Sequence, residues 1–350
     1  MKVLMPSVFG NEETKRTLVR AIENHRMPQV LILEGDQGSG KKTFAKEIVS
    51  SVFCSEREKG QKNIPCGECR ACMRVRDGIT PDVEYIRAEN GKASIGVEAV
   101  RTITERLSVG PCEMPMLFFI VEKADTMTPQ AQNAWLLTLE NPPEDVAFIL
   151  LCENAEKLLE TVRSRSVIFR MEAFPAEQTA KYISDNAELF GLSSALVSDK
   201  ERLFESAVSS GGSIGRAISL LDPRSSEELH KKRDFSFRAA EYITLRQGNA
   251  RERILFSNAF SAAREPLSES ISMLSLIFRD LIVIKKSDSA PLSFFTPSQR
   301  ERAEDMADAC TMQFLYSCRD ACENALSALT ANGSVKGIRL SLLLHLGLLT

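Results

Sequence analysis

Short apolar runs alternate with longer amphipathic segments over the first half of the chain. Four of the runs have the length and composition of buried strands, and they span 29–34, 116–121, 146–152 and 167–170. Segments with the three-to-four-residue apolar spacing of helices lie between them, for example 43–53 and 129–140. Apolar strands separated by helices predict a parallel sheet that is covered on both faces. Ligands of such sheets bind at the carboxyl ends of the strands.

The pattern becomes helical after Phe174-Pro175. Helices are predicted over 176–190, 200–209 and 214–221. The polar stretch 222–226, which contains a proline and two serines, has the composition of a linker. From 227 onward the periodicity is helical throughout, with a break near 287–297. The second half of the chain is therefore expected to be all-α.

The composition narrows the function only slightly. The 350 residues are 43% hydrophobic and 26% charged, which excludes a disordered or fibrous chain. A formal net charge of −3 leaves no bulk basic surface, so contact with nucleic acid has to come from a local patch or from partners. No signal-peptide pattern opens the chain, and no uncharged apolar stretch reaches the roughly 18 residues that span a bilayer. We expect a cytoplasmic protein without membrane contact.

A glycine-rich loop follows the first of these strands and opens a helix. It reads GDQGSGKKT from Gly35 to Thr43. In this setting glycines let backbone N–H groups face phosphates at a helix N-terminus. The alternative is an ordinary glycine-rich turn, but the order strand, loop, helix favours a phosphate loop. Its candidate nucleotide-binding residues are Gly35, Gly38, Gly40, Lys41 and Thr43.

The loop and the strand at 116–121 both depart from the pattern of an active ATPase. A phosphate loop normally has Ser or Thr directly after its lysine, to place a hydroxyl on Mg²⁺, and this chain has Lys42 there. Thr43 is rotated by about 100° on the helix and cannot simply substitute. The strand is followed by Glu122, which can hold Mg²⁺, and by Lys123 where a water-activating carboxylate is usual. Because a lysine ammonium cannot accept a proton at neutral pH, both departures predict a loss of hydrolysis.

Four of the nine cysteines cluster in the sequence. Cys54, Cys66, Cys69 and Cys72 have the spacing C-x11-C-x2-C-x2-C, and cysteines at x2 spacing lie on a tight knuckle from which they reach one tetrahedral ion. Four cysteines without histidine favour a closed structural Zn²⁺ site. An iron–sulfur cluster and a redox pair are the alternatives. The remaining cysteines are expected in the core, at positions 112, 152, 310, 318 and 322.

The order of these motifs resembles that of the bacterial DNA polymerase III clamp-loader family, which belongs to the AAA+ class. The stretch 130–143 reads QAQNAWLLTLENPP, close to the AxNALLKxLEEPP of the family, and Ser164-Arg165-Ser166 corresponds to its SRC motif. The segment 212–217, with Arg216, resembles the family's sensor 2. The stretch 332–336 and the leucine-rich segment after it resemble the family's terminal collar helix. The resemblance covers nearly the whole chain.

The resemblance implies an α/β AAA+ fold, a P-loop type parallel sheet with helices on both faces, and three domains. These are a core at 1–174 with a zinc knuckle inserted at 54–72, a helical lid at 175–222 and an all-α collar for oligomerisation at 223–350. Degraded nucleotide motifs beside an intact Ser-Arg pair are typical of the delta-prime branch of the family. In that branch Arg165 is an arginine finger, which acts in trans on ATP bound by a neighbouring subunit. Glu122 and Arg216 then belong to a degenerate nucleotide site.

The same branch implies partners. They are the gamma/tau and delta subunits of a hetero-pentamer, which places the sliding clamp on primed DNA as part of the DNA polymerase III holoenzyme. Contact with the clamp and with DNA is then made through the complex, and no ATPase activity of the chain itself is expected.

Two other functions stay open at this point. One is an ATP-hydrolysing gamma/tau-like subunit with an unusual phosphate loop, for which ATP turnover by the isolated chain is the discriminating observation. The other is an unrelated P-loop enzyme, such as a nucleotide kinase with a zinc-stabilised lid, which leaves the long helical second half unexplained. Whether ATP and Mg²⁺ bind without hydrolysis is also left open by the residues.

Overall fold

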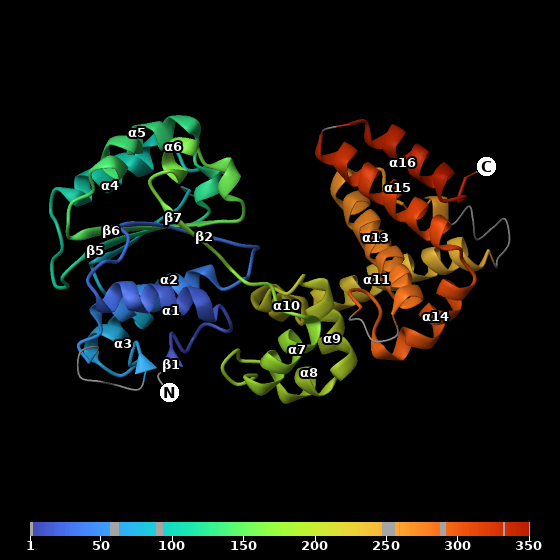
Figure 1. Cartoon of the computed structure of the whole chain (residues 1–350), viewed down its shortest axis with the longest axis horizontal. Helices are drawn as coiled ribbons and strands as arrows, with labels where there is room; N and C mark the ends of the chain where they lie inside the picture. The colour runs from blue at the N-terminus through green and yellow to red at the C-terminus, as the bar shows by residue number, and fades with distance from the viewer. Residues whose placement is uncertain are drawn as a thin grey trace. The chain divides into compact units, whose positions relative to one another are not determined.

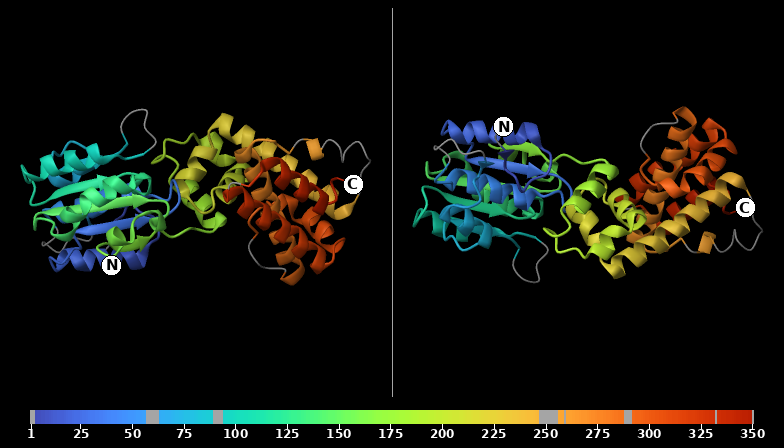
Figure 2. Two further views of the ribbon diagram at one scale, coloured as in Figure 1. Left: turned by 90° about the horizontal axis from the view of Figure 1, so that it is seen from above. Right: turned by 90° about the horizontal axis from the view of Figure 1, so that it is seen from below.

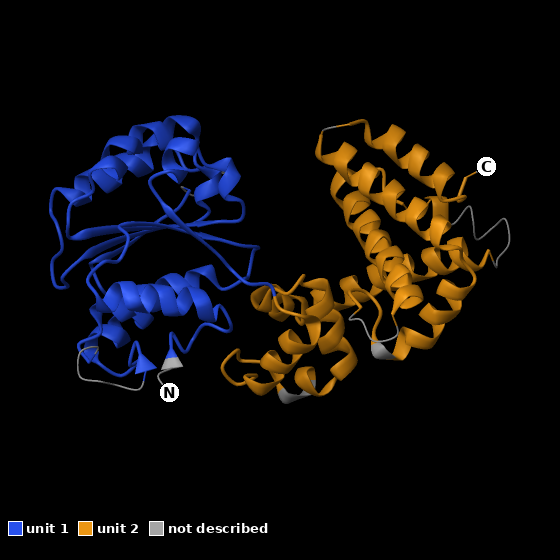
Figure 3. Cartoon of the chain, viewed as in Figure 1, with its two compact units in different colours: residues 1–173 blue, residues 174–350 orange. Residues whose placement is uncertain are grey.

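The structure, a computed structural model, describes residues 3–56, 63–88, 94–246, 256–258, 260–287, 292–331 and 333–349. The chain divides into two compact units, Met1–Ala173 and Phe174–Thr350 (Figure 3). Their boundary falls within one residue of the predicted end of the α/β core at 174. Asn332, the first residue of the stretch likened to a collar helix, and residues 288–291 of the predicted break lie outside the described ranges.

Unit 1 is built on five parallel strands. They are β2 (Val30–Glu34), β4 (Val83–Ile86), β5 (Leu117–Val121), β6 (Val146–Cys152) and β7 (Val167–Arg170). Their order across the sheet is β4-β5-β6-β2-β7, and every neighbouring pair is parallel. The four strands predicted from apolar runs are confirmed to within a residue. The apolar pattern misses β4, because this edge strand contains a glutamate and is mostly half-buried.

Helices cover both faces of the sheet (Figures 1 and 2). One face carries α4 (Val97–Leu107), α5 (Pro129–Glu140) and α6 (Glu160–Arg163), and the other carries α1 (Glu12–Glu23), α2 (Lys41–Phe53) and α3 (Arg70–Asp77). Successive side chains of a strand point to opposite faces. Phe119 of β5 therefore packs in one core with Trp135 of α5, whereas Phe118 packs in the other with Phe44 of α2. The rigid sheet fixes the loops at its carboxyl edge.

A second, two-stranded sheet lies in unit 1. It pairs β1 (Val3–Leu4) in parallel with β3 (Asn63–Ile64). The N-terminal segment is thereby tied to the segment that leads into the cysteine cluster.

Unit 2 is all-α in its described part, as predicted. Its α-helices are α7 (Ala176–Asp185), α8 (Ser194–Ser198), α9 (Lys200–Ser209), α10 (Ile214–Leu220), α11 (Pro223–Leu245), α13 (Arg264–Lys286), α14 (Arg300–Asp308), α15 (Met312–Thr330) and α16 (Val335–His345). A small hydrophobic cluster joins α7, α9 and α10, and a larger one joins α11 with α13 to α16. The division of this unit into lid and collar stays a prediction. Across the described ranges, no helix is long and apolar enough to cross a bilayer.

Two predictions about this half of the chain are wrong. The stretch 222–226 is not a linker but the start of α11: Asp222 caps the helix by accepting the backbone N–H groups of Arg224 and Ser225, and Pro223 occupies the first helical turn. An Asp-Pro pair is a helix start signal as well as a turn signal. The helix predicted over 176–190 ends at Asp185, and turns follow it.

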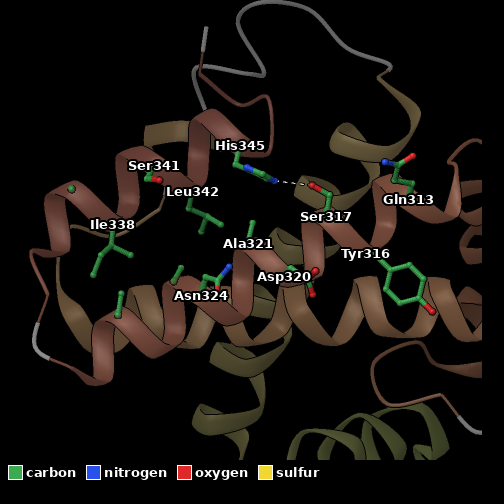
Figure 4. A pocket seen from close by; sticks show the side chains of 13 residues that line it. Gln313, Tyr316, Ser317, Asp320, Ala321, Asn324, Ile338, Ser341, Leu342 and His345 are labelled. Carbon is green, nitrogen blue, oxygen red and sulfur yellow. Dashed lines mark hydrogen bonds between the residues drawn. The ribbon is translucent and has the colours of Figure 1, made fainter.

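A groove of about 670 Å³ runs between α15 and α16 (Figure 4). Its lining includes Tyr316, Asp320 and Asn324 of α15 and His345 of α16, whose Nε2 lies 2.8 Å from Ser317 Oγ. None of the candidate site residues contributes to this groove.

Candidate functional site

The four cysteines predicted as zinc ligands come together in unit 1. Cys54 directly follows α2, Cys66 follows β3, and Cys69 and Cys72 lie at the start of α3. Their Sγ atoms all lie within 4.8 Å of one another. The sulfurs of Cys66 and Cys72 are 3.9 Å apart, close to the roughly 3.8 Å between two thiolates that each lie about 2.3 Å from a tetrahedral zinc. The donor set therefore fits one closed Zn²⁺ site.

Backbone N–H groups donate hydrogen bonds to two of the four cysteine sulfurs. The N–H of Cys69 donates to Cys66 Sγ at 3.3 Å, and the N–H of Cys72 donates to Cys69 Sγ at 3.5 Å. Burial works to raise the pKa of Cys69, but hydrogen bonds from Cys72 and Ser55 outweigh it and lower the pKa to about 6. Burial raises the pKa of Cys54 and of Cys72, because it penalises the charged thiolate, and a bound cation would compensate that charge. A partly buried set of four fits a structural metal better than an accessible redox pair.

Cys112 does not lie in the core, contrary to the prediction. It is exposed, and its backbone N–H donates to Asp82 Oδ1 at 2.6 Å in the turn before β5. The other four cysteines outside the cluster are buried, as predicted, at positions 152, 310, 318 and 322.

The candidate phosphate loop joins the carboxyl end of β2 to α2. Gly38 and Gly40 have φ of 79° and 90°, and this left-handed backbone favours glycine. Gly35 has no room for a side chain, because a Cβ there would lie 2.8 Å from Cβ of Met171. Thr43 is exposed on the first turn of α2. The loop thus joins a strand to a helix and has left-handed glycines at two of the predicted positions, and its binding of phosphate stays a prediction.

Lys41 folds back onto its own loop. Its ammonium donates to the carbonyl oxygen of Gly35 and, at 2.8 Å, to that of Asp36. Burial lowers the pKa of Lys41, while the negative charges around it, of which Glu153 is the strongest, act in the opposite direction. The carbonyl groups of the loop thus bind the Lys41 ammonium, which in a phosphate loop contacts the bound phosphate.

Glu122, the residue predicted to hold Mg²⁺, already has two cationic partners. Lys42 Nζ lies 2.7 Å from Glu122 Oε1, and Arg87 Nη2 lies 3.4 Å from the same oxygen. Lys42 also lies 5.2 Å from the ring centre of Tyr85. Mg²⁺ requires oxygen ligands in a near-ideal octahedron. Because an ammonium stands at the hydroxyl position and pairs with Glu122, the pair of Lys42 and Glu122 does not fit Mg²⁺.

Two further residues singled out in the sequence are Lys123 and Arg216. Lys123 is exposed and has φ of 53° in the turn after β5. Arg216 lies in unit 2, on the first turn of α10, where its backbone N–H donates to Ser213 Oγ at 3.3 Å. Within unit 1 the structure brings together the phosphate loop and Glu122. A role for Arg216 at that site stays a prediction.

Arg165 lies in the turn between α6 and β7 and is held by three contacts. Its Nη2 lies 2.6 Å from Glu140 Oε1, and its Nη1 donates to Thr161 O at 2.9 Å and to Ser164 Oγ at 3.4 Å. The side chain keeps 34% of its surface exposed. The guanidinium is therefore held by residues of its own unit, and the side chain is partly exposed.

Sequence reasoning missed Glu140, Tyr85 and Arg87. Tyr85 and Arg87 lie in and directly after β4, which the apolar pattern does not predict. Glu140 is visible in the sequence as the last acid before two prolines, but nothing in the sequence pairs it with Arg165.

A known protein family matches the first half of this chain. Residues 10–175 match the family described as DNA polymerase III, delta subunit. DNA polymerase III subunit delta' of Escherichia coli (strain K12) is 31% identical over 203 residues, which are 58% of this chain and 57% of that protein. Subunit gamma of Buchnera aphidicola subsp. Acyrthosiphon pisum is 26% identical over 221 residues, 62% of this chain and 58% of that protein. The chain thus spans less than two thirds of these relatives.

Among solved structures, a gamma subunit-related protein of Thermotoga maritima superimposes with a TM-score of 0.41 and 18% identity. The match covers 95% of this chain and 98% of that one.

Proposed function

Because this chain belongs to the family of DNA polymerase III clamp-loader subunits, we propose that it is a delta'-type subunit. In this proposal it hydrolyses no ATP and contributes Arg165 to ATP bound by a neighbouring subunit. Its partners are gamma/tau and delta subunits in a cytoplasmic hetero-pentamer, which loads the sliding clamp on primed DNA during replication.

The observation that carries the proposal is the ion pair between Lys42 and Glu122, at 2.7 Å. Hydrolysis of ATP needs a divalent cation on the phosphates and a group that orients the attacking water. The Lys42 ammonium, which is bound to Glu122, opposes binding of the divalent cation. Lys123 stands where the water-orienting group is needed and is a cation at neutral pH. Both changes stand at the carboxyl edge of the sheet, where the chemistry of a P-loop protein takes place.

The position of Arg165 supports the second part of the proposal. A guanidinium is permanently charged, and its planar fork matches the oxygens of a phosphate. An arginine supplied in trans can raise phosphoryl-transfer rates by roughly 10³–10⁵-fold. Arg165 lies outside the phosphate loop of its own unit and is partly exposed, as an arginine that acts on another subunit has to be.

We also propose that Cys54, Cys66, Cys69 and Cys72 hold one structural Zn²⁺. All four sulfurs are used and no histidine or water position is part of the set, so the ion would link α2 to α3 and have no catalytic role.

The test of the function is reconstitution with gamma/tau and delta subunits of the same organism. Rings that contain Arg165→Ala should assemble normally but show a lower clamp- and DNA-stimulated ATPase, and Arg165→Lys should restore little of it. Arg101→Ala is the matched control, because Arg101 forms an exposed ion pair of the same 2.6 Å length with Glu98. Equal ATPase rates in wild-type and Arg165→Ala rings would refute the role in trans.

A gamma/tau-like ATPase is the second candidate. It is favoured by the similarity to subunit gamma, which extends over 62% of this chain. Steady Mg²⁺-dependent ATP turnover by the isolated chain would favour this candidate over the first.

A further inference from the structure

Glu140 is the last residue of α5, and its carboxylate lies beside Arg165. The helix begins with Thr128, which caps it by accepting the N–H of Ala131, and it ends where Asn141-Pro142-Pro143 prevents another turn. Glu140 Oε1 lies 2.6 Å from Arg165 Nη2, although 25 residues separate the two in the sequence.

A carboxylate at this position does not help its own helix. The C-terminal end of a helix carries partial negative charge, so a cation there is favourable and an anion is not. Glu140 is 42% exposed, and exposed ion pairs contribute little to folding stability. The contact with Arg165 is therefore better explained by its effect on the orientation of the arginine than by a contribution to folding stability.

The three contacts of Arg165 define the direction of its guanidinium. Thr161 O and Ser164 Oγ hold Nη1 from within the short α6 turn, and Glu140 holds Nη2 from α5. Together they use three of the five N–H donors that an arginine has. Within the part of the chain that the structure describes, the other two donors have no protein acceptor. A guanidinium fixed along one edge presents the opposite edge in a defined direction.

We propose that Glu140 is a positioning residue: it fixes the guanidinium of Arg165 so that the free edge of the fork faces a phosphate held by a neighbouring subunit. The inference rests on the proposed role of Arg165 in trans. Glu140 does not touch the nucleotide and acts only through the arginine. The contact with Glu140 restricts the rotamers of Arg165 before the phosphate is bound. Less side-chain entropy is then lost when the arginine binds.

The experiment compares Glu140→Ala, Glu140→Gln and Arg165→Ala in reconstituted rings. Glu140→Ala should lower the Arg165-dependent part of the stimulated kcat about tenfold, because misplacing a catalytic group by about 1 Å can cost about 100-fold. Glu140→Gln, which keeps an oxygen acceptor, should fall between wild type and Glu140→Ala. KM for ATP should not change. Glu140→Ala combined with Arg165→Ala should be no slower than Arg165→Ala alone, since the glutamate acts only through the arginine.

Glu98→Gln is the matched control, because it weakens a 2.6 Å pair with Arg101 on another helix of the same face. If Arg165→Ala slows the ring and Glu140→Ala does not, the positioning role is overturned while the proposed function stands. If Arg165→Ala has no effect, the proposed function itself fails. A faster Glu140→Ala ring also overturns positioning, because it means that Glu140 restrains the arginine from reaching its target.

A second measurement needs no ring. Nitrogen relaxation of the Arg165 side chain in the isolated chain should show an ordered Nε–Hε group in the wild type and a mobile one in Glu140→Ala. Equal order in both proteins contradicts the proposal.

Discussion

Lys42 Nζ lies 2.7 Å from Glu122 Oε1, which joins the residue after the phosphate-loop lysine to the acid at the end of β5. In an ATPase these two positions hold a metal ion between them. In this chain the Lys42 ammonium binds the Glu122 carboxylate directly. Arg87 adds a second positive charge, with its Nη2 3.4 Å from the same carboxylate oxygen. Since the pair is half exposed on the lysine side, it contributes little to stability. The Lys42 ammonium therefore stands beside the carboxylate that would hold Mg²⁺ in an active ATPase.

Freeing Glu122 should change how the loop responds to Mg²⁺. Lys42→Thr restores a hydroxyl at the metal position and removes the ammonium, so nucleotide binding should become stronger with Mg²⁺ than with a chelator. Titration with a fluorescent ATP analogue measures this difference. Lys46→Thr is the control, because Lys46 contacts Arg76 O and not the loop. If the wild type already binds ATP only with Mg²⁺, Lys42 does not exclude the ion.

The isolated wild-type chain should turn over ATP far more slowly than about 1 s⁻¹, the low end of typical enzyme rates. Lys42→Thr alone should not restore turnover, because Lys123 still cannot accept a proton from water. A phosphate-release assay with the purified chain measures both. Turnover at about 1 s⁻¹ or more by the wild type would support the gamma/tau alternative.

Purified protein should contain about one zinc per chain. Cys72→Ser should release the metal, because a hydroxyl is a poor replacement for a buried thiolate. The sheet should stay folded, since neither of its two hydrophobic cores includes a cluster cysteine. Metal analysis with circular dichroism checks both points, and Cys112→Ser, at an exposed cysteine outside the cluster, is the control. Iron in place of zinc, or a native protein without metal, contradicts the assignment.

Unit 1 should lose folding stability in acid, because protonation of Glu34 removes a stabilising charge. Burial works to raise its pKa, but the N–H of Ala155 at 2.9 Å and the guanidinium of Arg170 at 2.9 Å lower it overall. A carboxyl whose folded-state pKa lies below the unfolded value stabilises the fold above the unfolded pKa, and this contribution is lost as pH falls through the folded pKa. Glu34→Gln should therefore lower the free energy of unfolding by about 1 kcal/mol at pH 7. The difference should shrink below about pH 4.

Urea denaturation of wild type and Glu34→Gln at both pH values gives this comparison. Glu98→Gln, at an exposed glutamate, is its control. A destabilisation of the same size at both pH values would mean that shape rather than charge is responsible.

Asp280 should be a main determinant of stability in unit 2. It is fully buried on α13, and its carboxylate accepts the backbone N–H groups of Ser293, Phe294 and Phe295. Asp280→Ala leaves these donors without an acceptor in the interior, so it should lower the free energy of unfolding by about 3 kcal/mol or more. Asp234→Ala, at a half-exposed aspartate, should cost far less. A loss below about 1 kcal/mol for Asp280→Ala would mean that water replaces the carboxylate.

Sequence analysis succeeds where the chemistry is local. Buried strands such as β2 and β6 are continuous apolar runs, because a parallel sheet between two helix layers has no polar face. The phosphate loop and the x2-spaced cysteines depend on neighbours within a few residues, so their spacing alone predicts their geometry. The linker prediction at 222–226 fails for a related reason: composition cannot separate a polar loop from a capped helix start, and the cap depends on the direction of the Asp222 side chain.

The tertiary structure alone determines which of these residues meet. Parallel pairing of β4 with β5 sets Tyr85 opposite Ile120, and this register brings Arg87 to Glu122. Lys42 reaches the same carboxylate from the first turn of α2. Likewise, Glu140 and Arg165 belong to elements that become neighbours only when α5 and α6 pack on one face of the sheet. Such contacts carry no sequence signal, because an exposed ion pair requires only opposite charge at each end and many other residues have it. The sequence by itself determined four of the five strands of the large sheet, the glycine-rich loop and the spacing of the cysteines, whereas packing decided that Glu122 pairs with Lys42 and that Glu140 holds Arg165.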